Sequence, residues 1–343
     1  MKKIIFTCLV FFSSLFLSTA IVNASDDSEQ VDYSIQPILP ENQIDRGNSF
    51  YDLRVNPGDK QTIKLQINNF SEAEQSFTIH VNPAETNGNL MIDYSGSRKE
   101  NLQEGKIKIN EIVKAPESVT IPGGKTGIVS LELSLPKEEF AGVILGGIQV
   151  KKALPDKKEA GLSTDYDYIL GMMLSESDEE IKPELKFVSV SPGVITNNAG
   201  LLVKMKNIHP MYSNKVHMVG NVYKTADKKQ AVITREIKDG GIAPDSDFQI
   251  NFFNGSVGAT EPLDAGDYLL KLDFTDAAGN NWHFEKEFSI TKKEAEAINT
   301  KVFTVKKDNS LLFVIIGVLT AILLILLVLI IVYLSRRKRE ESE

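Results

Sequence analysis

The sequence predicts an all-β fold: two tandem Ig-like β-sandwich domains followed by a single transmembrane helix. Apolar and polar residues alternate in QTIKLQIN (61–68), VSLELSL (129–135) and YLLKLDF (268–274), which is the period of half-buried strands. Polar turns rich in Pro, Gly, Asn and Asp, such as NPGDK and IPGGK, separate these runs. Short strands divided by such turns are typical of sandwiches, and the uncharged apolar run near the C-terminal end predicts the membrane helix.

The first 24 residues read as a signal peptide. Lys2 and Lys3 precede a long apolar run, and Val22 and Ala24 supply small residues at the positions that a signal peptidase recognises. We therefore expect cleavage after Ala24. An uncleaved anchor is the alternative.

Composition divides the exported part into two domains. We expect a first sandwich over 25–182, with the acidic segment SESDEEIKPE (175–184) as linker, and a second sandwich over 183–293. Residues 294–310 are polar and mixed, and we expect a juxtamembrane stalk there.

Residues 311–334 carry no charge and predict the membrane span. At about 1.5 Å per residue they reach across a hydrocarbon core of about 30 Å. The basic tail that follows, 335–343, is expected to stay cytoplasmic under the positive-inside rule. No LPxTG-like motif precedes the span, so the sequence predicts an anchor that remains in the membrane rather than a sortase substrate.

Composition also excludes several classes of function. The formal net charge is −8, which argues against nucleic-acid binding. The single cysteine, Cys8, lies in the signal peptide, so the exported part has no thiol for a disulfide, a zinc site or a nucleophile. We find no motif for a catalytic elbow, a zinc protease, a phosphate loop or a dinucleotide site, and expect no catalytic residue, cofactor or metal.

Two stretches hold the candidate partner-binding residues. In IQPILPENQID (35–45) the prolines predict an edge strand that ends in a polar turn, and Pro40, Glu41, Asn42 and Gln43 either satisfy that turn or contact a partner. In GVILGGIQV, Gly146 and Gly147 indicate a bulge, a close backbone approach or a ligand-facing strand. Glycan binding favours flat polar faces, for which Asn42, Gln43, Asn68 and Asn69 are suitable residue types.

Four blocks follow one another in the first domain: IQPILPENQID, YDLRVNPGDKQTIKLQINN, VNPAETNGNLMIDY and GVILGGI. In their order and spacing they are similar to the blocks of the WxL-interacting proteins of Gram-positive bacteria. SPGVITNN and LDAGDYLLKLDF in residues 185–290 resemble the second domain of that family. The resemblance implies a first domain that binds peptidoglycan, a second that binds host components such as extracellular-matrix protein, and WxL-type surface proteins as partners. It implies no catalytic residue.

Together these observations predict a non-enzymatic, membrane-anchored adhesion or scaffold protein of the cell surface. Two alternatives belong to other classes. A wall-active enzyme would need two acidic residues facing one groove, and a membrane sensor or accessory subunit would need a membrane partner because the tail is short.

Overall fold

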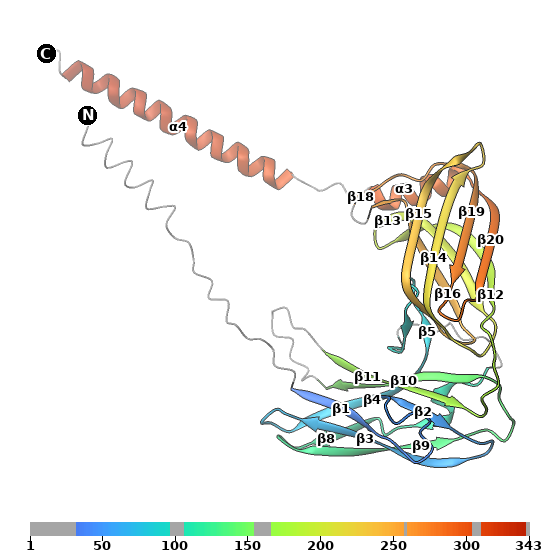
Figure 1. Cartoon of the computed structure of the whole chain (residues 1–343). Coiled ribbons are helices and arrows are strands. Elements are labelled where there is room, and N and C mark those ends of the chain that lie inside the picture. The colour runs from blue at the N-terminus through green and yellow to red at the C-terminus, as the bar shows by residue number, and fades with distance from the viewer. Residues whose placement is uncertain (1–31, 97–105, 154–165, 257–258, 304–309, 341–343) are drawn as a thin grey trace. The chain divides into compact units, whose positions relative to one another are not determined.

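The structure of the protein is a computed structural model that describes residues 32–96, 106–153, 166–256, 259–303 and 310–340 (Figure 1). The expected signal peptide lies outside the described residues. The chain forms two compact units. Of the described residues, the first unit contains 32–84, 93–96 and those from 106 to 181, and the second contains Glu85–Ile92 and those from 182 onward.

The first unit is a sandwich of two sheets. One sheet has the order β1-β3-β9-β7 and is antiparallel throughout, and the other has the order β2-β11-β10-β4-β8, with β2 and β11 parallel. The strands are β1 (Tyr33–Ile38), β2 (Tyr51–Arg54), β3 (Lys60–Asn69), β4 (Gln75–Pro83), β7 (Val113–Lys114), β8 (Ser118–Ile121), β9 (Thr126–Ser134), β10 (Val143–Lys152) and β11 (Asp167–Ser175). A single helical turn, α2 (Ile109–Ile112), packs its two isoleucines into the same core.

Two tyrosines cross this sandwich in opposite directions. Tyr33 on β1 donates a hydrogen bond to the carbonyl oxygen of Val150 on β10 at 3.0 Å. Tyr51 on β2 donates one to the carbonyl oxygen of Lys64 on β3 at 2.6 Å. Burial raises the pKa of Tyr33 to about 12 and also raises the pKa of Tyr51, so both phenols are protonated donors at neutral pH. Each tyrosine therefore joins its own sheet to the opposite one.

The second unit is also a sandwich. One sheet has the order β12-β13-β16 and the other the order β15-β14-β19-β20, and β17 pairs with β18. The strands are β12 (Leu185–Ile195), β13 (Asn198–Asn207), β14 (Ser213–Lys224), β15 (Asp227–Ile242), β16 (Asp247–Phe253), β17 (Gly255–Ser256), β18 (Ala259–Thr260), β19 (Gly266–Thr275) and β20 (Asn281–Ile290). Trp282, Phe284 and Phe288 on β20 face the core, as their alternation predicts.

The hairpin of β5 (Glu85–Thr86) and β6 (Ile92–Asp93) belongs to the second unit up to Ile92, although it follows β4 in the chain. Asn87 holds the turn, because its side-chain oxygen accepts hydrogen bonds from the amides of Asn89 and Met91. The turn places Leu90 in the left-handed region, with φ 53°, and leaves the side chain 0% exposed within the second core. The hairpin thus contributes a core residue to a sandwich built mainly from residues beyond 182.

Hydrogen bonds from backbone amides of β15 and the residue after it fix the hairpin within the second unit. The amide of Gly241 donates to the carbonyl oxygen of Leu90 at 2.6 Å, and the amide of Ala243 donates to Thr86 Oγ1 at 2.9 Å. A Cβ at Gly240 would lie 3.1 Å from that Leu90 oxygen. The glycine therefore permits the close approach of the two backbones.

The chain forms a helix directly after the second sandwich, in a region where we expected a stalk. α3 (Lys292–Phe303) starts at a capping box, in which Thr291 and Glu294 exchange hydrogen bonds between side chain and backbone. Ala295 is buried, and Ile298 and Val302 pack against the core. Much of the expected stalk is therefore part of the folded unit, and residues 304–309 lie outside the described residues.

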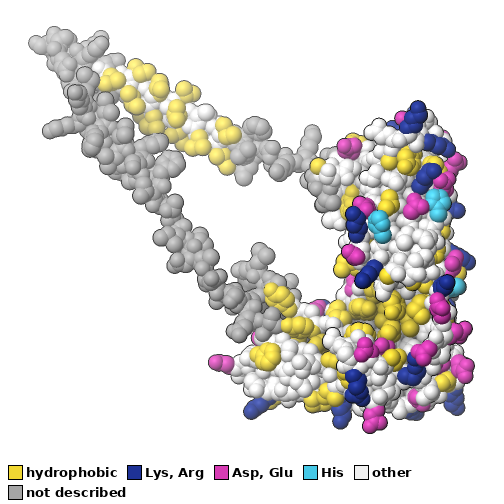
Figure 2. All heavy atoms as spheres, in the orientation of Figure 1, with side chains coloured by type: hydrophobic (Ala, Val, Ile, Leu, Met, Phe, Trp, Pro, Cys, Tyr) yellow, Lys and Arg dark blue, Asp and Glu magenta, His cyan; other side chains and the backbone are white. Residues whose placement is uncertain are grey.

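The last described element is α4 (Ser310–Glu340). Within it, Val314–Val332 is long and apolar enough to cross a membrane, at about 28 Å for 19 residues. Figure 2 shows hydrophobic side chains over this helix, in contrast to the mixed charged surfaces of the two units. The all-β class with two sandwiches and one apolar helix, as predicted from the sequence, is confirmed.

Replacing Leu90 by alanine is expected to destabilise the second unit by about 2–5 kcal/mol, because a fully buried leucine leaves a cavity when it is truncated. Trp282 is the only tryptophan and lies in that unit, so its fluorescence during urea unfolding reports on that unit alone. The matched control is Met91→Ala in the same hairpin, where the side chain is 59% exposed and the expected change is below about 0.5 kcal/mol. Equal midpoints for Leu90→Ala and wild type would contradict the role of the hairpin.

Candidate functional site

The outer face of the sheet β1-β3-β9-β7 gathers uncharged polar side chains from three strands. Strand pairing aligns Ser34, Asn68 and Thr126 in one row and Gln36, Gln66 and Ile128 in the next. Neighbouring strands lie about 4.8 Å apart, so the two rows form a flat grid. We call these six residues the amide face.

Hydrogen bonds run across the amide face from strand to strand. Asn68 Nδ2 donates to Ser34 Oγ at 3.0 Å, and Asn68 Oδ1 accepts from Thr126 Oγ1 at 2.8 Å and from Gln66 Nε2 at 3.0 Å. These contacts link Ser34, Gln66, Asn68 and Thr126 to one another in the absence of a ligand. Preorganisation of this kind lowers the entropy lost on binding.

The chemistry of the amide face suits a neutral ligand rich in hydroxyl and amide groups. Glutamine and asparagine offer both donors and acceptors, and none of the six residues is ionisable. Charged side chains begin only in the next rows, with Lys64 and with Glu132, which accepts a hydrogen bond from Thr62. Ile128 is 50% exposed and adds a small apolar contact.

The outer face of the other sheet in the first unit is partly covered by the chain itself. Asn82 donates from its side-chain amide to the carbonyl oxygen of Tyr94 at 2.9 Å and to Gln149 Oε1 at 3.2 Å. Gln149, only 3% exposed, in turn donates to Asp167 at 3.1 Å. Gln149 on this second face is therefore buried, whereas on the amide face Gln36 is exposed and Gln66 and Asn68 are half-buried.

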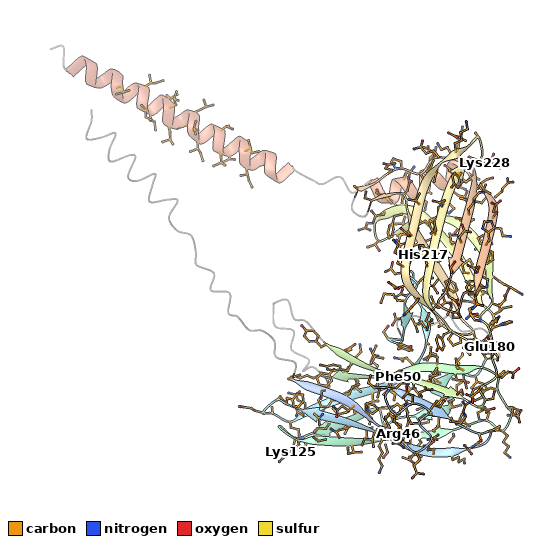
Figure 3. All side chains as sticks on the ribbon, in the orientation of Figure 1. Arg46, Phe50, Lys125, Glu180, His217 and Lys228 are labelled. Carbon is orange, nitrogen blue, oxygen red and sulfur yellow. The ribbon has the colours of Figure 1, made fainter. Side chains whose placement is uncertain are left out.

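The sequence-predicted turn Pro40–Gln43 has a clear structural role. Gln43 is 6% exposed, and its side chain accepts from the amide of Asp52 at 3.1 Å and donates to the carbonyl oxygen of Phe50 at 3.1 Å. It thereby fixes the loop that leads into β2 (Arg46 and Phe50 of this loop are labelled in Figure 3). Partner contact by Gln43 stays a prediction.

The side chain of Asn42 is also used within the fold. Its Nδ2 donates to the carbonyl oxygen of Arg54 at 2.8 Å, and its Oδ1 accepts from Gln61 Nε2 at 2.8 Å. Glu41 is exposed, and contact of a partner with Glu41 stays a prediction. The turn and the amide face are separate sites on the first unit.

Gly146 and Gly147 lie on β10 where other segments approach closely. A Cβ at Gly146 would lie 2.4 Å from Ile109 Cγ2, and one at Gly147 would lie 2.6 Å from Tyr94 Cβ. The sequence left open a bulge, a close backbone approach or a ligand-facing strand. The contacts show a close approach of other segments to β10. A partner contact at these glycines stays a prediction.

The two neighbouring asparagines that we considered for glycan binding differ in burial. Asn68 points outward and is central to the amide face, whereas Asn69 is 1% exposed. The amide of Asn69 donates to the carbonyl oxygens of Ala73 and Ile121, both at 2.9 Å, and so ties down two loops. Strand alternation could have separated the two residues, but only strand pairing brings Ser34, Gln36 and Thr126 beside Asn68.

Two histidines of the second unit lie beside surface carboxylates. His217 Nε2 lies 2.8 Å from Glu236 Oε1, and His283 Nδ1 lies 2.6 Å from Asp273 Oδ1. The hydrogen bond to Asp273 raises the pKa of His283. Across the described residues, no three His, Cys, Asp or Glu side chains gather as a metal site would require.

The fold and the amide face define a tandem β-sandwich protein with a surface suited to binding. Residues 33–152 match the family model described as WxL Interacting Protein, peptidoglycan binding domain, and residues 157–300 match WxL Interacting Protein, host binding domain. The chain belongs to the WxL-interacting protein family. No curated protein matches it.

Several solved structures resemble the chain at low identity. The CsuC–CsuE chaperone–tip adhesion subunit complex of Acinetobacter baumannii is 14% identical with a TM-score of 0.36, and the match covers 74% of this chain and 97% of that chain. The E. coli chaperone DraB is 14% identical with a TM-score of 0.27, over 76% of this chain and 97% of that one. The fold assignment rests on the strand pairing described above.

Gln43→Ala is expected to destabilise the first unit by about 1–3 kcal/mol, since it leaves the buried amide of Asp52 without its acceptor. Hydrogen–deuterium exchange of the peptide containing β2 measures the effect. Glu41→Ala, an exposed change in the same turn, is the control and should leave exchange unaltered. Unchanged protection of β2 in Gln43→Ala would show that the side chain is dispensable.

His283 is expected to titrate above its ordinary pKa of about 6.5, as measured by NMR of its ring protons. Because the folded pKa is raised, the pair with Asp273 stabilises the fold below pH about 6.5, and this stabilisation is lost as the pH rises through the folded pKa. Asp273→Asn should lower the midpoint of the His283 titration. Glu287→Gln on the same strand is the control, and an unmoved midpoint in Asp273→Asn would contradict the assignment.

Proposed function

We propose that this protein is a non-enzymatic, membrane-anchored scaffold of the cell surface that binds peptidoglycan through the amide face of its first unit. The observation that carries the proposal is an open sheet face whose preorganised side chains include three amides and no charge. Glycan strands with acetamido groups present the matching hydroxyl and amide partners. The family match over residues 33–152 supports this ligand class.

Weak individual contacts suit a polymeric ligand. A single hydrogen bond exchanged with water contributes about 1 kcal/mol, so one sugar held by the amide face would bind weakly. A cell wall repeats the same unit many times and places many copies near each anchored protein, which raises the effective concentration. Retention at the wall therefore needs no deep pocket.

The anchor and the second unit complete the proposal. α4 spans the cytoplasmic membrane, with the basic end after residue 335 inside and both sandwiches outside, within the wall. The second unit binds host proteins, which the family match over residues 157–300 supports. WxL-type surface proteins are the further partners that membership of this family suggests.

The test is retention of the full chain, in detergent, by purified peptidoglycan sacculi. We expect the triple change Gln36→Ala, Gln66→Ala and Asn68→Ala to weaken retention about tenfold or more, because it removes several hydrogen bonds of about 1 kcal/mol each. The matched control is Ser76→Ala with Thr120→Ala, which removes an exposed hydroxyl pair from the other sheet. If the triple variant were retained as strongly as the wild-type protein, the proposal that this face binds peptidoglycan would be wrong.

A further inference from the structure

One open side of the second sandwich is formed by two edge strands from different sheets. β15 ends the sheet β15-β14-β19-β20, and β16 ends the sheet β12-β13-β16. The two strands approach at Arg235 and Phe253, where the guanidinium carbon lies 5.5 Å from the ring centroid. We call the line between β15 and β16 the seam.

Beyond Arg235 toward the end of β15, the seam is filled by the chain itself. The buried side chain of Leu90 enters the core beside Gly240 of β15, where the amide of Gly241 donates to the carbonyl oxygen of Leu90. The side chain of Asn89 accepts a hydrogen bond from Arg235 Nη2 at 2.8 Å. The seam thus already holds one apolar side chain, which a hydrogen-bonded turn of the chain presents to the core.

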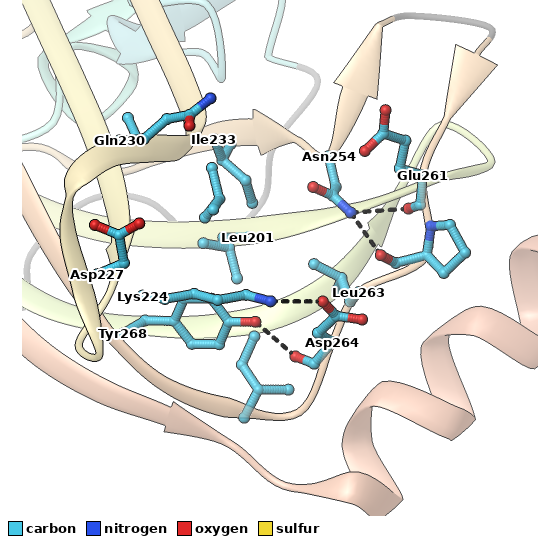
Figure 4. A pocket seen from close by; sticks show the side chains of 14 residues that line it. Leu201, Lys224, Asp227, Gln230, Ile233, Asn254, Glu261, Leu263, Asp264 and Tyr268 are labelled. Atoms are coloured by element: carbon cyan, nitrogen blue, oxygen red, sulfur yellow. Dashed lines mark hydrogen bonds and ion pairs between the residues drawn. The ribbon is translucent and has the colours of Figure 1, made fainter.

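On the opposite side of Arg235 the seam opens into a pocket of about 400 Å³ (Figure 4). Its floor is apolar: Leu201, Ile233, Leu263 and Ile290 are each 5% exposed or less. The amide of Asn254 braces one wall by donating to the carbonyl oxygens of Glu261 and Pro262, both at 2.9 Å. The volume lies at the lower end of the range for ligand pockets and fits one large side chain with its adjoining backbone.

The rim of the pocket carries an excess of negative charge. Lys224 is paired with Asp264 at 2.8 Å, and Tyr268 donates to the carbonyl oxygen of Asp264 at 2.8 Å. Asp227 and Glu261 also line the pocket, and neither forms an ion pair with any cation of the described residues. A ligand that brings positive charge beside an apolar group matches this distribution.

We propose that this pocket binds an apolar side chain of an extended partner peptide that carries basic residues beside it. The way the chain fills the far end of the seam with Leu90 supports a peptide as the occupant, and the edge strand β15 offers main-chain groups alongside. Asp227 and Glu261 supply the preference for lysine or arginine. The inference rests on the proposed role of the second unit in binding proteins.

The probes are three fluorescein-labelled peptides: Gly-Lys-Leu-Lys-Gly, Gly-Lys-Ser-Lys-Gly and Gly-Glu-Leu-Glu-Gly. Binding to the full chain in phosphatidylcholine nanodiscs is measured by fluorescence anisotropy. The leucine peptide with lysines should bind about tenfold more tightly than either of the others. The serine peptide lacks the leucine that the pocket would bury, and the glutamate peptide lacks the positive charge that matches Asp227 and Glu261. Equal affinities for the leucine and serine peptides would overturn the proposal.

Variants then locate the site. Ala231→Phe fills the pocket and should weaken binding of the lysine–leucine peptide at least tenfold, whereas Val188→Phe on the exposed side of β12 should not. Asp227→Asn with Glu261→Gln leaves the pocket open and should remove the preference over the glutamate peptide. Melting temperatures of all variants, followed by Trp282 fluorescence, identify any that are misfolded. Unaltered binding in folded Ala231→Phe, or an unaltered charge preference, counts against the pocket.

Retention of purified host extracellular-matrix proteins by the same variants separates this inference from the proposed function. Loss of retention in both Ala231→Phe and the charge variant supports the pocket as the protein-binding site. Wild-type retention in both variants would refute the pocket while leaving host binding by the second unit intact. Absence of retention by the wild-type protein itself would refute the host-binding role on which the inference rests.

Discussion

A β-sandwich buries one face of each of its two sheets, and the apolar space between them must be closed where edge strands do not meet. The first unit closes this space with α2 and with Tyr33 and Tyr51, whose hydroxyl groups reach the backbone of the opposite sheet. The second unit uses Leu90 at its seam and α3 after its last strand. The closing segments are short, yet each places apolar side chains that water would otherwise reach.

Closure also determines which surfaces remain free to bind. In the first unit, Tyr94 covers part of one sheet and engages Asn82, so the amides there serve the fold. The opposite sheet keeps its amides accessible and orders them through hydrogen bonds among themselves. In the second unit the seam is filled at one end and open at the other. Both proposed binding surfaces are therefore parts of the sandwiches that no segment among the described residues covers.

Much of the fold was predictable because alternation in a strand is a local property. QTIKLQIN gave the correct inward and outward faces of β3, and Trp282 faces the core as expected. The site was only partly predictable. Gln43 was a suitable residue type for glycan binding, but its side chain is buried by the loop that leads into β2. The hairpin around Leu90 escaped prediction because its partners, Gly241 and Ala243, lie about 150 residues away. The capping box at Thr291 was a local signal that we missed.

The sequence by itself determined the strands, the apolar helix near the end of the chain and the family, since these depend on residue order over short windows. Tertiary structure alone decided that Ser34, Asn68 and Thr126 form one row, and that Leu90 completes a core distant in sequence. The physical reason is that strand pairing and sheet stacking bring together residues far apart in the chain, and no local pattern specifies those partners.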